Sequence, residues 1–374
     1  FDQYTNDIVN KIESNARAKD LAIQAGLEIK THNEQDSKLE LPDEFKRTLL
    51  PYQKLPAEHL FTVGNGANFS VPGSGKTTIA LASYSMMKHN KQADKILVIC
   101  PRSAFMAWEE EFEKCFERLP NTVRLCGDNI LDNHNNVDIL LSTYQLMSYR
   151  QAEFEELLQN HNILMILDES HNIKNGKKYN TTSWSIVARE LAPYAARRMV
   201  LTGTPCPQAL GDLWAQYEFL WPDTNILGSY QQFNDYTKIH DSLGQYRERV
   251  DGLHTRISKE DLNLPPVHFE EIDVPMDPLQ AKIYNAIEAK AIEELTNESA
   301  AESAKMAGFR GDRGGKIIRM IQAASNPELL TKRDAEFELN STKSLIDEET
   351  SELIENYHKY GHIPHKLMEV CKKA

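Results

Sequence analysis

Four short apolar runs, each ending in small or polar residues, constrain the fold of this chain more than any other feature. They are KILVICP (95–101), VDILLSTY (137–144), ILMILDES (163–170) and RRMVLTGTP (197–205). Longer amphipathic stretches such as MAWEEEFEKCFERL (106–119) separate them. Continuous apolar strands that alternate with helices are typical of a parallel sheet covered on both faces. The sequence therefore predicts an α/β fold, and such sheets bind ligands at the carboxyl ends of their strands.

Composition and charge limit the class of protein. With 374 residues, 41% of them hydrophobic and 26% charged, the chain is long enough for two or three globular domains. No apolar run approaches the roughly 20 residues that span a bilayer, so we expect no membrane partner. The net charge of −13 argues against indiscriminate nucleic-acid binding, although a local basic track remains compatible with it. The five cysteines never form a CxxC pair, which argues against a disulfide framework or a zinc site and favours a reducing cytosol.

The outer parts of the chain have a different texture. Residues 1–45 predict one or two polar helices, and polar helices also follow FLWP (219–222). The run HFEEIDVPM (268–276) is strand-like, and a long helical stretch follows at 279–307. GFRGDRGGK (308–316) predicts a flexible basic loop, either solvated or in contact with DNA. Because the chain opens on Phe1 without a signal peptide, we expect an excised or processed fragment.

The segment NFSVPGSGKTTIA (68–80) is close to the phosphate-binding pattern G-x-x-x-x-G-K-[ST]. Only the first glycine departs from it, since Ser70 stands there. Gly73 and Gly75 let backbone amides turn toward an anion, and Lys76 supplies a positive charge for the β- and γ-phosphates. Thr77 offers a hydroxyl to Mg²⁺ at the start of a predicted helix. The alternative, a glycine-rich turn that caps a helix, requires neither the lysine nor the hydroxyl.

An independent element supports the phosphate loop. The apolar run ILMIL ends in Asp168 and Glu169, and two adjacent carboxylates at the end of a buried strand are costly without a counter-charge. A metal ion held by Thr77 would provide it. Asp168 is then predicted to hold Mg²⁺, directly or through water, and Glu169 to orient and deprotonate the attacking water. Taken alone, a solvated acidic turn explains the two residues equally well.

The order of further segments resembles a Swi/Snf-type ATPase of helicase superfamily two. LLPYQ (49–53) resembles L-R-P-Y-Q, ILVICPRSAFMAWEEEFEKCF resembles I-V-C-P-x-S-L-x-x-N-W-x-x-E-F-x-K-F, and DILLSTYQLM resembles D-V-V-I-T-T-Y-E-x-L. ILDESHNIKN resembles L-D-E-A-H-R-I-K-N, and the segment from RRMVLTGTP to FLWP resembles R-L-L-L-T-G-T-P followed by L-W and F-L-x-P. RISKEDLNLPPVHFEEIDVPM and IRMIQAASNPELL are similar to segments that open the family's second lobe. The resemblance runs from about residue 48 to the end of the chain.

The resemblance implies a motor that hydrolyses ATP with Mg²⁺ and tracks along double-stranded DNA. Its nucleotide contacts would be Gln53 at the adenine, then Gly73, Ser74, Gly75, Lys76, Thr77 and Thr78. Its DNA contacts would be Pro101, Arg102, Ser103, Thr143, Tyr144, Lys174 and Asn175. Backbone amides, hydroxyls and a few cations along a groove suit sequence-independent binding of phosphates. The residues that link the two sites would be Thr202, Gly203 and Thr204.

The sequence predicts a helical N-terminal segment (1–45), and the resemblance implies the rest of the domain plan. This is a first RecA-like lobe (46–224), a helical protrusion (225–262), and a linker with the start of a second lobe that includes a helical insertion (263–374). Because most of the second lobe of such a motor would be missing, weak or no ATP hydrolysis is expected. Departures from the family, SVPGSGKT for D-E-M-G-L-G-K-T and PQA (207–209) for Q-N-N, suggest a divergent, prokaryotic branch.

Two other readings stay open at this point. One is a different superfamily-two motor, an RNA helicase or a restriction-type translocase; LTGTP followed by LW and FLWP, in place of S-A-T, favours the Swi/Snf reading. The other is a non-catalytic scaffold, against which Lys76, Thr77, Asp168 and Glu169 weigh together. The expected location is the cytoplasm, or the nucleus of a eukaryote. Protein partners and the process served are not predicted.

Overall fold

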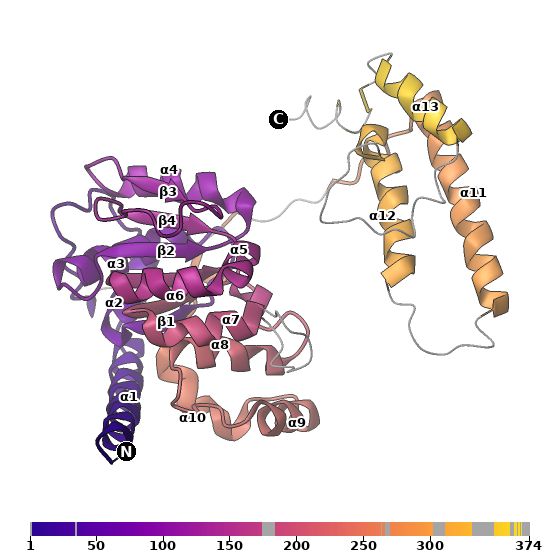
Figure 1. Ribbon diagram of the computed structural model, residues 1–374. Helices are drawn as coiled ribbons and strands as arrows, with labels where there is room; N and C mark the ends of the chain where they lie inside the picture. The colour runs from indigo at the N-terminus through magenta and orange to yellow at the C-terminus, as the bar shows by residue number, and fades with distance from the viewer. Residues whose placement is uncertain are drawn as a thin grey trace. The chain divides into compact units, whose positions relative to one another are not determined.

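A seven-stranded sheet forms the centre of the larger part of the chain, as the computed structural model shows (Figure 1). The structure describes residues 2–33, 36–173, 184–262, 264–265, 270–301, 311–330, 348–359, 363, 364, 366 and 368. The strand order is β3-β4-β2-β5-β6-β1-β7, and every described pairing is parallel. The strands are β1 (Asn65–Asn68), β2 (Lys95–Ile99), β3 (Thr122–Arg124), β4 (Ile139–Ser142), β5 (Ile163–Asp168), β6 (Arg197–Leu201) and β7 (His254–Thr255). The predicted α/β fold is confirmed.

Alternate side chains of each strand build two separate apolar cores. In β2, Ile96 and Val98 pack in the core beneath one group of helices, whereas Leu97 and Ile99 pack beneath the other group. The first group is α2 (Pro51–Val63), α3 (Lys76–His89) and α4 (Phe105–Cys115). The second group is α5 (Tyr144–Tyr149), α6 (Gln151–Asn160), α7 (Trp184–Leu191) and α8 (Leu213–Leu220). Burial on both faces is the reason that the strands are apolar without a break.

Two strands have sequences that do not look like strands. β1 reads NGAN, yet all four of its residues are buried between β6 and β7. β7 follows α9 (Tyr230–His240) and the short α10 (Arg247–Val250). It lies inside the range 225–262 that the sequence suggests is a protrusion, but it pairs with β1 and therefore extends the sheet. Tertiary pairing overrides the weak strand propensity of both segments.

The N-terminal helix α1 (Asp2–Lys30) packs against the turn at Asp251–Leu253 and against α2. His59 of α2 lies under this contact, where its Nε2 donates to the carbonyl of Gly252 at 2.9 Å. Burial and the neighbouring Lys30 lower the pKa of His59 to about 3, so its ring is neutral. The Nδ1 atom of that ring finds no partner in the described part of the chain.

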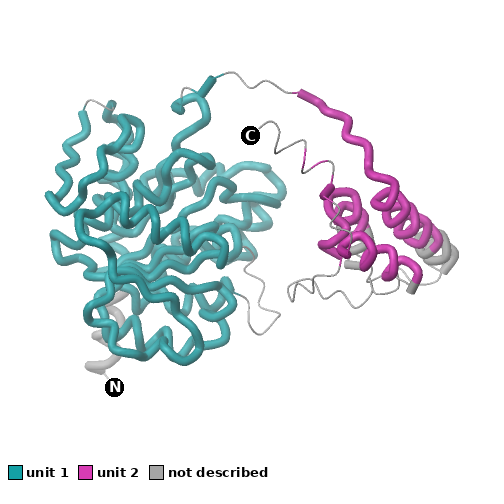
Figure 2. The backbone as a smooth tube through the Cα atoms, turned by 90° about the horizontal axis from the view of Figure 1, so that it is seen from above, with its two compact units in different colours: residues 1–265 teal, residues 266–374 magenta. Residues whose placement is uncertain are grey.

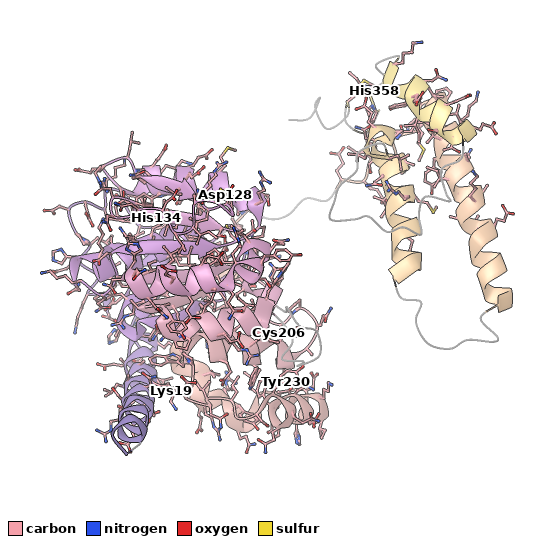
Figure 3. All side chains as sticks on the ribbon, in the orientation of Figure 1. Lys19, Asp128, His134, Cys206, Tyr230 and His358 are labelled. Carbon is pink, nitrogen blue, oxygen red and sulfur yellow. The ribbon has the colours of Figure 1, made fainter. Side chains whose placement is uncertain are left out.

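Contacts divide the chain into two units, residues 1–265 and 266–374, which Figure 2 colours separately. The described helices of the second unit are α11 (Pro278–Ala301), α12 (Gly311–Ser325) and α13 (Glu348–Lys359). They share a small apolar core that includes Ile283, Ala323 and Tyr357. His358 of α13, labelled in Figure 3, places its Nδ1 atom 2.9 Å from a carboxylate oxygen of Glu328. None of the described helices combines the length and the apolarity that a membrane span requires.

Two expectations for this second unit are wrong where they can be compared. Residues 311–316 of the predicted basic loop form the first turns of α12, and the rest of that loop lies outside the described residues. α12 includes these glycines because the apolar residues that follow them pack against α11, and this packing stabilises the helix. The strand-like run 268–276 forms no strand at its described residues, 270–276. Its Pro275 cannot donate to a sheet, which disfavours a strand there.

Candidate nucleotide site at the carboxyl edge of the sheet

Strand register brings the predicted functional segments to one edge of the sheet. Asn68 at the end of β1 lies opposite Leu201 of β6, and Leu201 lies opposite Asp168 of β5. On the other side of β5, Ile99 of β2 pairs with Ser142 of β4. The segments that follow these strands therefore emerge side by side, as the carboxyl ends of parallel strands do. This edge holds the predicted nucleotide, coupling and DNA residues that follow a strand and are among the described residues.

The loop between β1 and α3 has the backbone of a phosphate cradle. Gly73 and Gly75 both have a φ of 81°, in the left-handed region that favours glycine. A Cβ atom on Gly75 would clash with the Nε2 atom of Gln53, so a larger residue would displace this buried amide from its bond to the loop. The loop ends where α3 begins at Lys76, which directs the free amides of that helix toward the loop.

Ser70 is accommodated in the place of the usual glycine by two hydrogen bonds. Its hydroxyl oxygen accepts from the amide of Ile257 at 2.9 Å, and its own amide donates to the side-chain oxygen of Asn68 at 3.1 Å. Val71 extends this contact, since its amide donates to the carbonyl of Ile257 at 3.1 Å. The serine therefore ties the loop to the segment that follows β7.

Lys76 crosses the loop, and no carboxylate of the described residues lies within ion-pair distance of it. Its Nζ atom donates to the carbonyls of Ser70 at 3.1 Å and Val71 at 3.3 Å. Burial lowers the pKa of Lys76, and the carboxylates of Glu169 and Asp168 act in the opposite direction. Neutral carbonyls are weaker partners for an ammonium group than phosphate oxygens are. The side chain is therefore placed to exchange these carbonyls for an anion.

Asp168 is held by donors on both carboxylate oxygens. Trp108 of α4 donates its indole N–H to Oδ2 at 2.8 Å, and the amide of Glu169 donates to Oδ1 at 3.0 Å. Burial raises the pKa of Asp168, while the Trp108 hydrogen bond lowers it. Trp108 is only 1% exposed, so its ring is held by the surrounding core. Its hydrogen bond therefore fixes the orientation of the Asp168 carboxylate. Sequence reasoning did not single out Trp108.

Glu169 leaves the sheet with a strained backbone and connects to the next strand end. Its φ is 51°, and its Oε2 atom lies 3.2 Å from Nδ1 of His171. The same nitrogen lies 3.1 Å from the hydroxyl of Thr202, which also accepts from the amide of Thr204 at 3.1 Å. A Cβ atom on Gly203 would lie 2.9 Å from the ring of Pro72 in the phosphate loop. The predicted coupling residues thus touch both Glu169's partner and the loop.

A second set of hydrogen bonds, through α8, also joins the carboxyl ends of β5 and β6. Ser170 donates its hydroxyl to Oε1 of Gln216 at 2.7 Å, and Nε2 of Gln216 donates to the carbonyl of Pro205 at 2.8 Å. Gln216 lies on α8 and is fully buried. A polar residue in the middle of the mainly apolar segment LWAQYEFL was the available signal for it, since a buried polar side chain needs partners. His171 and Gln216 were both missed by the sequence analysis.

Two predicted nucleotide side chains are bonded within the protein. Gln53 is buried, accepts from the amide of Leu50 at 3.0 Å and donates from Nε2 to the carbonyl of Ser74 at 3.0 Å. It therefore supports the phosphate loop from beneath. Thr78 is also buried, and its hydroxyl donates to the carboxylate of Glu111 on α4. Thr77, the neighbouring residue, is half-buried at the start of α3.

The predicted DNA residues differ in accessibility. Arg102 and Ser103 are exposed in a short 3₁₀ turn after Pro101. Thr143 uses its hydroxyl to accept from the amide of Leu146 at 3.2 Å, as the N-cap of α5. Tyr144 is buried rather than on the surface, with its hydroxyl donated to the carbonyl of Asp168 at 2.8 Å. Its side chain thus supports the Asp168 turn, and Lys174 and Asn175 lie outside the described residues.

The residues present fit a magnesium–nucleotide complex. Within the described ranges, no group of three or more His, Cys, Asp or Glu side chains is placed to hold a metal ion alone. Mg²⁺ commonly takes one or two protein oxygens and completes its shell with phosphates and water, which matches Thr77 and Asp168. The buried hydroxyl of Ser74 finds no hydrogen-bond partner among the described residues, as expected of a group reserved for a ligand.

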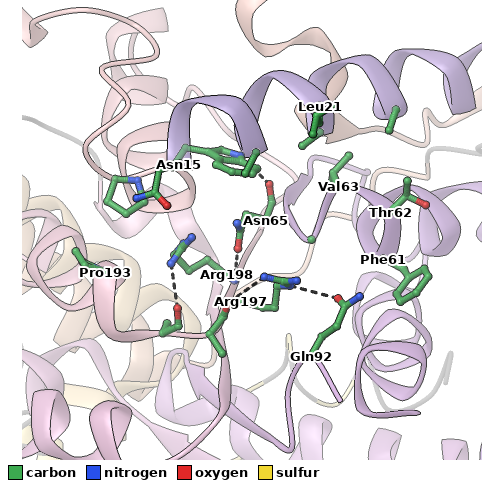
Figure 4. Close-up of a pocket in the computed structure, with 18 residues that line it drawn as sticks. Asn15, Leu21, Phe61, Thr62, Val63, Asn65, Gln92, Pro193, Arg197 and Arg198 are labelled. Atoms are coloured by element: carbon green, nitrogen blue, oxygen red, sulfur yellow. Dashed lines mark hydrogen bonds between the residues drawn. The ribbon is translucent and has the colours of Figure 1, made fainter. Parts of the chain in front are cut away.

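A cavity of about 530 Å³ lies at the opposite, amino ends of β1 and β6 (Figure 4). Its two arginines are bonded within the protein. Arg198 donates to the carbonyls of Leu220 at 2.9 Å, Ala192 at 2.8 Å and Ala195 at 3.0 Å. Arg197 donates to the side-chain oxygen of Gln92 at 3.3 Å. These charges serve the ends of neighbouring helices, so the cavity is not the candidate site.

Comparisons with known proteins agree with this geometry. Residues 69–319 match the SNF2-related domain family. YwqA of Bacillus subtilis, whose name includes "ATP-dependent helicase/translocase", is 27% identical over 335 residues, covering 83% of this chain and 34% of YwqA. Helicase SWR1 of Candida albicans is 31% identical over 203 residues, covering 50% of this chain and 12% of SWR1. The chain therefore spans about a third of the length of YwqA and less of SWR1.

Among solved structures, the Sulfolobus solfataricus SWI2/SNF2 ATPase core in complex with dsDNA has a TM-score of 0.53 and 24% identity. The alignment covers 87% of this chain and 67% of that one. At this identity the likeness concerns the fold, which is the RecA-like fold expected from the sequence. The family match covers more than half of the chain, and by it the chain belongs to the SNF2-related domain family.

Proposed function

We propose that this chain contributes the first ATPase lobe, and the start of the second, to a motor that couples hydrolysis of Mg-ATP to movement along double-stranded DNA. The observation that carries the proposal is the meeting of Lys76 and Thr77 with Asp168 and Glu169 at one sheet edge. The link from Glu169 through His171 to Thr202 supports coupling of that site to the rest of the lobe. The whole motor would also need a second lobe.

Each residue of the site has a chemical role in this proposal. Gly73 and Gly75 present backbone amides to the phosphates, and Lys76 exchanges its two carbonyl partners for β- and γ-phosphate oxygens. Mg²⁺, when bound through Thr77 and Asp168, supplies charge that stabilises the developing negative charge on the phosphates. Glu169 orients the attacking water and accepts its proton, and its exposed side chain can reach solvent.

Duplex DNA is the proposed track because the matched Sulfolobus core was solved with dsDNA and because Arg102 and Ser103 are exposed beside the site. The acidic charge of −13 confines binding to a narrow seam that contacts few phosphates. A compartment that holds DNA and keeps thiols reduced, the cytoplasm or a eukaryotic nucleus, suits this role. An RNA helicase or a restriction-type translocase is the competing motor.

The test compares ATP hydrolysis by the protein with both lobes present, in the presence of duplex DNA, single-stranded DNA, RNA and no nucleic acid. Stimulation by duplex DNA of two unrelated sequences supports the proposal, whereas preferential stimulation by RNA favours the helicase alternative. Absence of hydrolysis under all four conditions would support a scaffold.

A salt titration of DNA binding then tests the track itself. We expect log affinity against log salt to have a slope of about 2 to 4, because each neutralised phosphate adds roughly 0.9. Arg102→Ala should lower the slope by about one and weaken all sequences alike. An unchanged slope would remove Arg102 from the track.

A further inference from the structure

Helix α4 touches both halves of the candidate magnesium site. Its buried face contains Phe105, Trp108, Phe112 and Cys115, which pack into the core shared with α3. From this face the indole of Trp108 holds Oδ2 of Asp168 at 2.8 Å. The other oxygen of that carboxylate is bonded to the amide of the neighbouring Glu169, so Trp108 is the contact that comes from a different element.

One turn further along α4, Glu111 reaches the other half. Its Oε1 atom accepts from the hydroxyl of Thr78, in the first turn of α3, and lies 2.5 Å from Nη1 of Arg47. Thr78 directly follows Thr77, the residue proposed to hold the metal ion. Trp108 and Glu111 are three positions apart and therefore lie on one side of the helix. A single helix thus contacts Asp168 directly and Thr78, the residue next to Thr77.

The amino end of the same helix lies at the proposed DNA track. The 3₁₀ turn Arg102–Ala104 continues into α4 without an intervening loop. Arg102 and Ser103 are exposed there, and Trp108 follows Arg102 by six positions, which is about 10 Å along a helix. A helix with a close-packed apolar face moves as a body, so a shift at one end displaces groups held along its length.

We propose that α4 transmits DNA binding at Arg102 and Ser103 to the magnesium site through Trp108 and Glu111. The two side chains are positioning residues: Trp108 sets the orientation of Asp168, and Glu111 sets the first turn of α3 beside Thr77. Bound phosphate shifts the start of α4 and brings the two metal-binding groups into register. This rests on the proposed function and specifies how DNA regulates that site.

The decisive variant is Trp108→Phe, which keeps an aromatic ring in the core and removes the N–H donor. Trp221→Phe is the matched control, because Trp221 is also buried and donates its N–H to a backbone carbonyl, that of Asn65, at 3.0 Å. Trp221 lies at the amino end of β1, away from the candidate site. Three quantities are measured in the protein with both lobes present: affinity for ADP with and without Mg²⁺, affinity for duplex DNA without nucleotide, and hydrolysis with and without duplex DNA.

For Trp108→Phe we expect Mg²⁺-dependent strengthening of ADP binding to fall about tenfold, as on loss of a hydrogen bond behind a metal ligand. Stimulation by DNA should fall while DNA affinity stays unchanged, because the track itself is intact. Trp221→Phe should match the wild type in all three quantities. If Trp108→Phe and Trp221→Phe behave alike, the proposal is overturned.

Glu111→Gln gives a second, milder test if the tryptophan variant folds poorly. It keeps an acceptor for Thr78 but loses the ion pair with Arg47, so DNA stimulation should fall about twofold to fivefold. Full stimulation in this variant would contradict the role of Glu111. If the wild type shows no stimulation by DNA, the proposed function fails; if the wild type is stimulated and the variants remain fully stimulated, only the α4 mechanism fails.

Discussion

The two ends of the strands β1 and β6 carry similar polar residues in opposite circumstances. At the carboxyl ends, Lys76 has two backbone carbonyls as partners and Ser74 has no described partner for its hydroxyl. At the amino ends, Arg198 donates to three carbonyls around a cavity of about 530 Å³. Helices that follow parallel strands begin at the carboxyl edge and end at the amino edge. Amides at one edge are therefore free to receive an anion, whereas carbonyls at the other already satisfy the cations.

The largest expected difference between the carboxyl and amino edges is the effect of replacing Lys76 on ATP hydrolysis. In the protein with both lobes present, Lys76→Ala should lower ATP hydrolysis on the order of 10²–10⁴-fold, because it removes charge at the phosphates in the transition state. Arg197→Ala, which removes a half-buried cation at the amino edge, should leave the rate unchanged. Steady-state hydrolysis of both variants, with a thermal melt of each, decides the matter. If Lys76→Ala retains half of the wild-type rate of hydrolysis, the assignment of the phosphate loop is wrong.

Glu169→Gln sharpens the comparison within the carboxyl edge. It preserves the shape of the side chain and leaves Asp168 in place, so nucleotide should still bind while hydrolysis falls on the order of 10²-fold. The measurement pairs fluorescent-nucleotide binding with turnover. Loss of nucleotide binding would show that Glu169 is structural rather than the base.

At the amino edge the expected effect is on stability instead of turnover. Arg198→Met leaves the carbonyls of Leu220, Ala192 and Ala195 without their donor, which should cost about 2 kcal/mol of unfolding free energy. Urea unfolding followed by tryptophan fluorescence suits this test, because all four tryptophans lie within residues 1–265. Turnover per folded molecule should not change. If Arg198→Met lowers turnover without lowering stability, the amino edge also takes part in hydrolysis and the two edges do not differ in function.

The last expected effect, confined to acid pH, is a pH dependence near the amino edge. His59 is neutral in the fold, where its pKa is about 3, and it gains a proton on unfolding below its ordinary value of 6.5. Its contribution to stability is therefore complete above pH 6.5 and is lost as the pH falls toward 3, at up to about 1.4 kcal/mol per pH unit.

The check is the pH slope of the unfolding free energy in urea. His59→Gln should flatten that slope by up to one proton, and His89→Gln, at the exposed end of α3, should leave it unchanged. A slope that persists in His59→Gln would assign the acid sensitivity to another group, such as His254, whose pKa burial lowers to about 4.

Sequence pattern predicted the parts of this fold in which local chemistry and tertiary structure agree. The apolar runs that became β2, β4, β5 and β6 are buried on both faces, so their composition alone indicates strands. β1 escaped prediction because NGAN has low strand propensity and acquires its conformation from β6 and β7. The glycine-rich start of α12 was mistaken for a loop because its helix depends on packing further along the chain.

The candidate site shows the same division. Lys76, Thr77, Asp168 and Glu169 carry their chemistry in adjacent residues, so spacing in the sequence was enough to propose them as site residues. Trp108 acts across 60 positions, and no local pattern shows that its indole meets Asp168. Tyr144 is a case in which the sequence misled. Its side chain was expected to contact DNA at the surface, but it is buried and its hydroxyl donates to the carbonyl of Asp168.

The backbone of Glu169 sets two kinds of selection against each other. With a φ of 51°, this residue occupies a conformation that costs a side-chain-bearing residue about 1–2 kcal/mol, and glycine would relieve that cost. A laboratory evolution experiment that rewards heat resistance alone should therefore enrich glycine or asparagine at position 169. One that rewards turnover should restore glutamate each time, at the expense of a lower melting temperature.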